Sequence, residues 1–211
     1  MNENNNLSIN TFDNINSIDI SKKNNILIKI IFSFAFTILM AISANVFLYI
    51  PSTPIPITLQ TLTVLLSGIF LGSKFAALSQ LQYLILGIIG FPVFAGFKSS
   101  ITAILGPTGG FLIGFIFAAF VTGYIYEKLN ISLKNKIFLC FISCLVGLII
   151  IYFFGFIHLF FILYFLGNHN DAKLVLFNTF NYAIKPFILI DFIKLFIVID
   201  LTSILNIKKN K

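Results

Sequence analysis

Charged residues are scarce in this sequence: they make up only 10% of its 211 residues, and arginine is absent. Hydrophobic residues account for 58% of the chain, and the mean hydropathy is +1.01. This composition lies far outside the range of soluble domains, which carry about 25% charged residues. A water-soluble fold is therefore excluded.

Residues that commonly perform catalysis or bind metals are also few. The two histidines, His158 and His169, belong to no Ser/His/Asp or His-Glu-x-x-His arrangement. Cys140 and Cys144 share one helix face, but they lack the usual metal-ligand spacings, so we interpret them as small buried residues. Segment 106–110, Gly-Pro-Thr-Gly-Gly, is not followed by Gly-Lys-Ser/Thr and is no phosphate-binding loop. These absences argue against an ATPase or a membrane-embedded enzyme.

The formal net charge of +7 does not indicate a nucleic-acid partner. The lysines lie at the ends of apolar segments and form no stripe with interleaved aromatic residues. We therefore interpret them as determinants of membrane topology and expect no contact with nucleic acid.

Two regions differ in composition along the chain. Residues 1–25 are polar and asparagine-rich and lack the basic start and apolar middle of a signal peptide, so we predict a disordered cytoplasmic tail. Residues 26–211 are apolar enough for one membrane domain, since a span needs about 20 apolar residues. Prolines, glycines and polar turns divide this domain into six predicted helices, at 26–49, 57–71, 75–91, from 106–110 to about 126, at 137–166 and at 183–205.

Six crossings place both termini on one side of the membrane. Lysines near the termini, at Lys74 and in the 127–136 turn lie on that side, whereas Lys98, Lys173 and Lys185 lie on the other. The excess of lysine on the first side predicts that both termini are cytoplasmic. Together with the apolar segments, this predicts an all-α integral membrane protein with six transmembrane helices, located in the cytoplasmic membrane. The loops at 50–56, 94–100 and 168–171 then share the outer face and are expected to converge over a pocket.

One acid and one base interrupt the last predicted helix. Asp191 and Lys194 are three residues apart and so share a helix face. Each charge costs about 2.5 to 3.5 kcal/mol at the bilayer centre, so both should face the protein interior. They could form a salt bridge that only neutralises itself, or Lys194 could snorkel to the interface. The alternative that we favour is a binding site for a small solute such as a cyclic urea, whose N–H groups donate to a carboxylate while its carbonyl accepts from an ammonium.

The first predicted helix carries a stripe of small residues. Ser33, Thr37 and Ala41 are four residues apart, a pattern that lets another helix approach closely. The stripe is a candidate docking face for a partner protein. Packing against the protein's own helices is at least as good an interpretation.

Three stretches, in order, resemble the BioY family, the biotin-binding S component of energy-coupling factor (ECF) transporters. The first is Pro-Ile-Pro-Ile-Thr-Leu-Gln at 54–60. The second runs from Tyr83 through Gly-Phe-Pro-Val-Phe-Ala-Gly at 90–96 to Gly-Pro-Thr-Gly-Gly-Phe at 106–111. The third is Pro186-Phe187 with Asp191 and Lys194. The resemblance extends from Ile26 to the C-terminus.

The resemblance implies a function in high-affinity biotin uptake. An S component of this kind is a non-enzymatic membrane subunit that captures biotin from outside and delivers it inward. It docks on an ECF module of one transmembrane coupling protein and two ATPases, so ATP is hydrolysed by the partners and this chain needs no cofactor. Membrane lipid would surround it. An S component for another vitamin, thiamine or riboflavin, stays the alternative, and a purely structural scaffold is a further one.

The resemblance also implies which residues bind biotin. Asp191 and Lys194 are expected to engage the ureido ring. The glycine-rich loop of the family is replaced by Phe-Lys-Ser-Ser at 97–100, and Leu112 stands where some members carry an arginine, so Lys98 is the expected partner of the biotin carboxylate. The remaining expected ligand-binding residues are Gly96, Ser99, Gln60, Tyr83, Thr108 and Gly109.

Overall fold

The computed structural model describes residues 26–129, 135–166 and 171–209. The predicted tail, 1–25, and His169 lie outside the described residues. In chain order the elements are an N-terminal helix Ile26–Asn45, β1 Phe47–Leu48, β2 Ile57–Thr58, α2 Gln60–Ile88, α3 Ile101–Leu105, α4 Gly109–Leu129, α5 Lys136–Leu166, α6 Ala172–Ala183 and α7 Ile188–Lys209. The predicted all-α class is confirmed, with one short hairpin added.

Four of the described helices are long and apolar enough to cross a membrane. They are the N-terminal helix, α2, α4 and α5. Many of their isoleucines, leucines and phenylalanines are exposed, for example Ile31, Phe117 and Phe153. A helix satisfies its own backbone hydrogen bonds, which is what a segment in lipid requires, and its exposed apolar side chains suit lipid contact.

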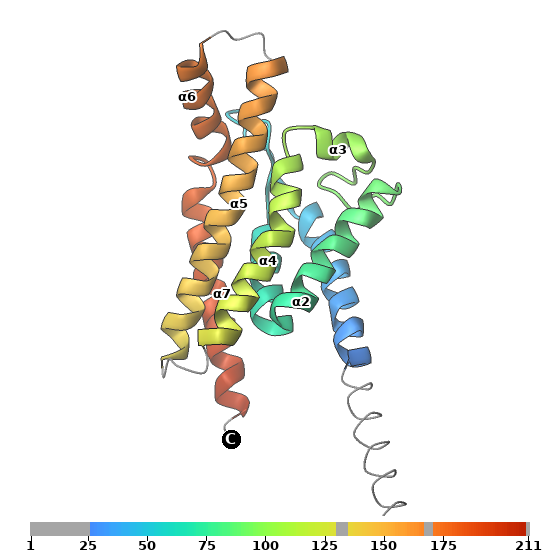
Figure 1. Cartoon of the computed structure of the whole chain (residues 1–211), viewed down its shortest axis with the longest axis vertical. Coiled ribbons are helices and arrows are strands. Elements are labelled where there is room, and N and C mark those ends of the chain that lie inside the picture. Colours follow the sequence, from blue (N-terminus) through green and yellow to red (C-terminus); the bar gives the residue numbers. More distant parts are fainter. Residues whose placement is uncertain (1–25, 130–134, 167–170, 210–211) are drawn as a thin grey trace, which may run out of the picture.

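Helix α2 joins two of the predicted helices across a kink. Gly72 has a φ of 74° and a ψ of 174°, and helical geometry continues on both sides of it. The break predicted near residues 72–74 is thus present, but the separating loop is not. In Figure 1 the two legs of α2 diverge from this point. Helix α4 packs closely here, because a Cβ on Gly123 would lie 2.5 Å from the backbone nitrogen of Ser73.

The predicted first helix, 26–49, is too long at its C-terminal end. The helix ends at Asn45, and the chain then forms β1, which pairs antiparallel with β2 in the register Phe47↔Thr58 and Leu48↔Ile57. Backbone pairing across the proline-containing loop competes successfully with a further helical turn. Thr58 ends β2, and Gln60 begins α2 directly after the hairpin.

The predicted last helix, 183–205, is wrong at its start. Helix α6 ends at Ala183, a turn follows, and α7 begins only at Ile188. Proline fixes its own φ and disfavours helical backbone in the residue before it, so Pro186 separates the two helices. Asp191 consequently lies in the first turn of α7.

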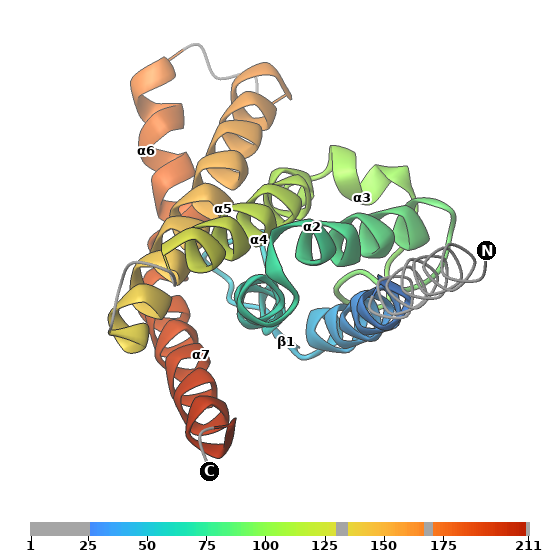
Figure 2. The same ribbon diagram turned by 60° about the horizontal axis from the view of Figure 1, so that its bottom comes forward.

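Helix α4 lies at the centre of the helical packing. It contacts α2 on one side and α5 on the other, and α5 in turn packs against α6 and α7. Figures 1 and 2 show the N-terminal helix beside the second leg of α2, far from α7. The core residues include Leu65, Phe115 and Leu148, all at most 5% exposed.

Candidate functional site

Asp191 and Lys194 form a buried ion pair on α7. Lys194 Nζ lies 2.6 Å from Asp191 Oδ1, and the two residues are 4% and 2% exposed. Lys194 Nζ also donates to the carbonyl oxygen of Thr58 at 2.7 Å, which ties α7 to the β-hairpin. The charges face the protein interior, as the sequence predicts, and snorkelling of Lys194 is not observed.

Tyr152 is a third member of this cluster that the sequence reasoning missed. Its hydroxyl donates to Asp191 Oδ2 at 2.7 Å from helix α5. Each oxygen of the Asp191 carboxylate therefore accepts at least one hydrogen bond, and an ionised carboxylate has further acceptor capacity. An ammonium has three N–H donors, of which the described structure uses two. The cluster thus offers both an acceptor and a donor to a ligand.

A cavity of about 550 Å³ opens next to the pair, in the size range of small-molecule sites. It is walled by the loop at 50–58, the loop at 94–100, segment 106–108 and the inner faces of α4, α5 and α7. Aromatic side chains including Phe111, Phe115 and Phe187 supply much of its surface. Among the described residues, the charged ones that line it are Asp191, Lys194 and Lys98, which together carry one net positive charge.

Gln60 and Tyr83 are linked to each other at the cavity wall. Gln60 lines the cavity, and its Nε2 donates to Tyr83 Oη at 3.0 Å. Tyr83 does not line the cavity itself but donates to the carbonyl oxygen of Val93 at 3.2 Å. The predicted contact of Tyr83 with ligand is therefore indirect in this geometry, because its hydroxyl holds Gln60 and the loop start in place.

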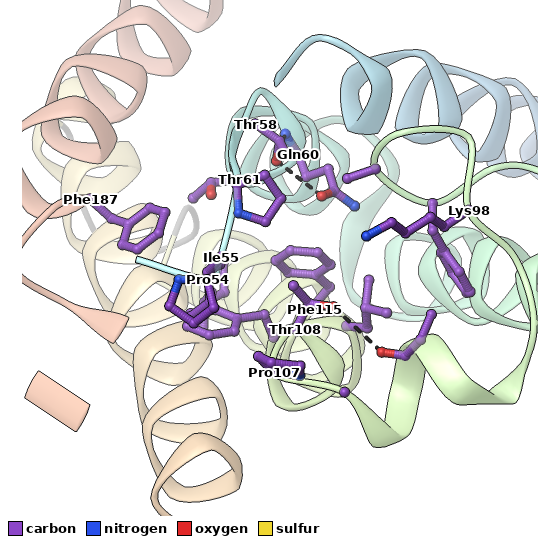
Figure 3. A pocket seen from close by; sticks show the side chains of 18 of the residues that line it. Pro54, Ile55, Thr58, Gln60, Thr61, Lys98, Pro107, Thr108, Phe115 and Phe187 are labelled. Atoms are coloured by element: carbon purple, nitrogen blue, oxygen red, sulfur yellow. Dashed lines mark hydrogen bonds between the residues drawn. The ribbon is translucent and has the colours of Figure 1, made fainter. Parts of the chain in front are cut away.

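Lys98 and Ser99 line the cavity from the loop at 94–100. Figure 3 shows the side chain of Lys98. Gly96 is not among the lining residues; its φ of 74° lets the chain turn so that Lys98 can pair with Phe94 through two backbone hydrogen bonds. The side-chain oxygen of Asn45 accepts from the backbone N–H of Phe97 at 2.8 Å. The loop is thereby attached to the N-terminal helix.

Thr108 lines the cavity, whereas Gly109 supports it from behind. A Cβ on Gly109 would lie 1.6 Å from the carbonyl oxygen of Ile104, so only glycine fits there. His158 Nε2 lies 3.0 Å from the carbonyl oxygen of Gly106. His158 is thus a packing residue that positions segment 106–110.

The stripe of small residues on the N-terminal helix packs internally. Ser33 and Thr37 are 0% and 1% exposed, and their hydroxyls donate to the carbonyl oxygens of Phe75 and Ser79. Ala41 is half-buried on the same helix. Internal packing is the arrangement that the structure shows, and a docking role for the stripe stays a prediction.

The two cysteines and the acidic residues form no further site in the described part of the chain. Cys140 and Cys144 are free and buried, and no group of three or more His, Cys, Asp or Glu residues is placed to hold a metal ion there. The interpretation of the cysteines as buried packing residues is confirmed.

Fold and site together define a helical membrane protein with a cavity near one end of its helices and a buried ion pair in the wall of that cavity. A model of the BioY family matches residues 14–209. The chain belongs to the BioY family.

Similar proteins agree with this assignment. The chain is 37% identical to "Biotin transporter BioY" of Thermotoga maritima over 174 residues, which cover 82% of this chain and 92% of the relative. It is 39% identical to "Probable biotin transporter BioY" of Pyrococcus horikoshii over 142 residues, covering 67% and 74%. A crystal structure of the S component for biotin from an ECF-type ABC transporter matches with a TM-score of 0.73 and 27% identity, covering 87% of this chain and 93% of that one.

Proposed function

We propose that this protein is the S component of an ECF transporter that captures biotin from outside and delivers it inward. The observation that carries the proposal is the buried Asp191–Lys194 pair beside a cavity whose lining has one further cation, Lys98. A cyclic urea can donate to Asp191 and accept from Lys194, while the ligand carboxylate balances Lys98. Biotin combines these groups in one molecule.

The protein is a transporter subunit and not an enzyme. Its relatives are named biotin transporters and its structural neighbour is an S component. We propose that ATP is hydrolysed by partner subunits, two ATPases that act with a transmembrane coupling protein, and that this chain carries no cofactor. We also expect no nucleic-acid partner, because the lysines lie at the ends of apolar segments.

The proposed setting is the cytoplasmic membrane, crossed six times with both termini inside and lipid around the apolar faces. The N-terminal helix, the two legs of α2, α4, α5 and the α6–α7 segment would supply the crossings. The distribution of lysines supports this orientation, because they are concentrated on the side that holds the termini. The cavity then opens to the outside.

A competition experiment separates biotin from the other vitamins. Purified protein loaded with labelled biotin should release it to excess unlabelled biotin or desthiobiotin, since both carry the ureido ring and the carboxylate. Thiamine and riboflavin at the same excess should leave the label bound. Displacement by either vitamin with no effect of desthiobiotin would contradict the proposal.

A further inference from the structure

The lining of the cavity divides by solvent exposure into a floor and a mouth. At the floor, Asp191, Lys194 and Gln60 are 2%, 4% and 6% exposed. At the mouth, Phe97 is 70% exposed and Lys98 is also exposed. The acceptor and donor for a urea are thus shielded from water, and the extra cation is not.

The floor and the mouth lie at different ends of the cavity. Asp191 follows Phe187 by one helical turn, and its backbone N–H donates to the Phe187 carbonyl oxygen at 2.8 Å. Figure 3 shows Phe187 and Lys98 on opposite sides of the cavity, with the Lys98 side chain pointing inward from its loop. A ligand held by its ring at Asp191 therefore directs its carboxylate tail toward Lys98 and the solvent.

The floor and the mouth should differ in how much the binding constant changes when the ligand group next to them is altered. A hydrogen bond to a buried charged group changes a binding constant by about tenfold or more. An exposed ion pair changes it by less than about fivefold, because water screens the charges and the long side chain must be ordered. Moreover, Tyr49 is exposed and its hydroxyl oxygen would lie 3.5 Å from a Cβ on Gly96 in the loop that carries Lys98, so a group added beyond the carboxylate extends into solvent.

From this difference in exposure we infer that the protein selects its ligand by the ureido ring and tolerates replacement of the carboxylate. Its substrate class then includes esters and amides of biotin, among them biotin joined to the side-chain amine of lysine. The inference rests on the proposed function, since it assumes that biotin is bound by its ring at Asp191 and Lys194.

Displacement of labelled biotin from the purified full-length protein tests the inference. Three competitors are compared with biotin: biotin methyl ester and biotinyl-lysine, which change the tail, and 2-iminobiotin, which replaces the ring carbonyl that accepts from Lys194. The two tail-modified ligands should bind less than about tenfold more weakly than biotin, as expected for an exposed ion pair. 2-Iminobiotin should bind more than about tenfold more weakly, because a buried hydrogen bond to a charge is lost.

Lys98→Gln provides the matched variant. It should weaken biotin less than about tenfold and should remove the difference between biotin and its methyl ester. A loss of tenfold or more for either tail-modified ligand, or for biotin on Lys98→Gln, would overturn the inference. The proposed function would stand in that case, because it depends only on biotin binding to the wild-type protein. The inference would also be overturned if 2-iminobiotin displaced labelled biotin as well as biotin methyl ester does. If biotin itself does not bind, the proposed function fails and the inference fails with it.

Discussion

Asp191 is held in place by donors from two other groups. Lys194 donates to Oδ1 and Tyr152 donates to Oδ2, so the carboxylate plane is fixed before a ligand arrives. Such preorganisation lowers the entropic cost of binding. Buried ion pairs can often be replaced by apolar residues of similar volume without loss of stability. The fold by itself therefore does not require this pair, which favours a binding role over a purely structural scaffold.

Tyr152→Phe should weaken biotin binding by about ten- to a hundredfold, because a hydrogen bond to a charged group contributes about 1.5 to 3 kcal/mol. Tyr164→Phe is the matched control, since Tyr164 lies on the same helix but outside the cavity lining. Calorimetric titration of both variants measures the effect. Equal affinity in Tyr152→Phe and Tyr164→Phe would show that Asp191 does not depend on Tyr152.

Some residues of the Asp191 cluster can be predicted from the sequence and others cannot, for a physical reason. A charge inside an apolar helix is costly and therefore conspicuous, which is how Asp191 and Lys194 are found. A tyrosine in an apolar helix is common, so nothing in the sequence marks Tyr152 as the partner of a carboxylate 39 residues away. The carbonyl oxygen of Thr58 is equally hidden, because a backbone acceptor leaves no trace in the residue type.

At the scale of the element, the kink in α2 determines where the second leg begins. Glu127 on α4 accepts from the backbone N–H and the hydroxyl of Ser73, at 3.2 and 2.8 Å. A carboxylate at a helix N-terminus satisfies free donors and complements the helix dipole. Glu127 thus caps the second leg just after the positive φ of Gly72.

Gly72→Ala should lower the thermal midpoint of the detergent-solubilised protein more than Gly90→Ala does. Both glycines have positive φ, at 74° and 109°, but only a Cβ on Gly72 meets another atom, lying 1.9 Å from Glu127 Oε1. The new methyl group would displace the capping carboxylate. In a Glu127→Ala background, Gly72→Ala and Gly90→Ala should lower the thermal midpoint by similar amounts. If Gly72→Ala still lowers the midpoint more than Gly90→Ala, by the same margin as with Glu127 present, displacement of Glu127 is not the cause of that margin.

A breaker does not always lead to a correct helix boundary. Pro186 lies between α6 and α7, yet the predicted last helix crosses it, because 172–183 mixes polar and apolar residues and resembles a loop. The pairing of β1 with β2 depends on backbone hydrogen bonds across a proline-containing segment. No alternation of residue types reveals a strand of two residues.

At the scale of the whole molecule, the proposed topology places the cavity mouth outside and the α4–α5 turn inside. Cysteines introduced at two exposed positions, Ser52→Cys and Lys136→Cys, can report the two sides. The native cysteines, Cys140 and Cys144, are 1% and 0% exposed and should react slowly. An impermeant maleimide should label only Ser52→Cys on intact cells and both variants after permeabilisation. Labelling of Lys136→Cys on intact cells would contradict the orientation.

The central claim is that Asp191 and Lys194 hold the ureido ring of biotin. Calorimetric titration of the purified protein and of the double variant Asp191→Asn/Lys194→Met tests it most directly. The double variant leaves no unpaired buried charge, so it should stay folded. Wild-type protein should show saturable binding, and the variant should bind about two to four orders of magnitude more weakly, because two charge-assisted hydrogen bonds are lost. Absence of saturable binding to the wild type, or unchanged affinity in the folded variant, would contradict the claim.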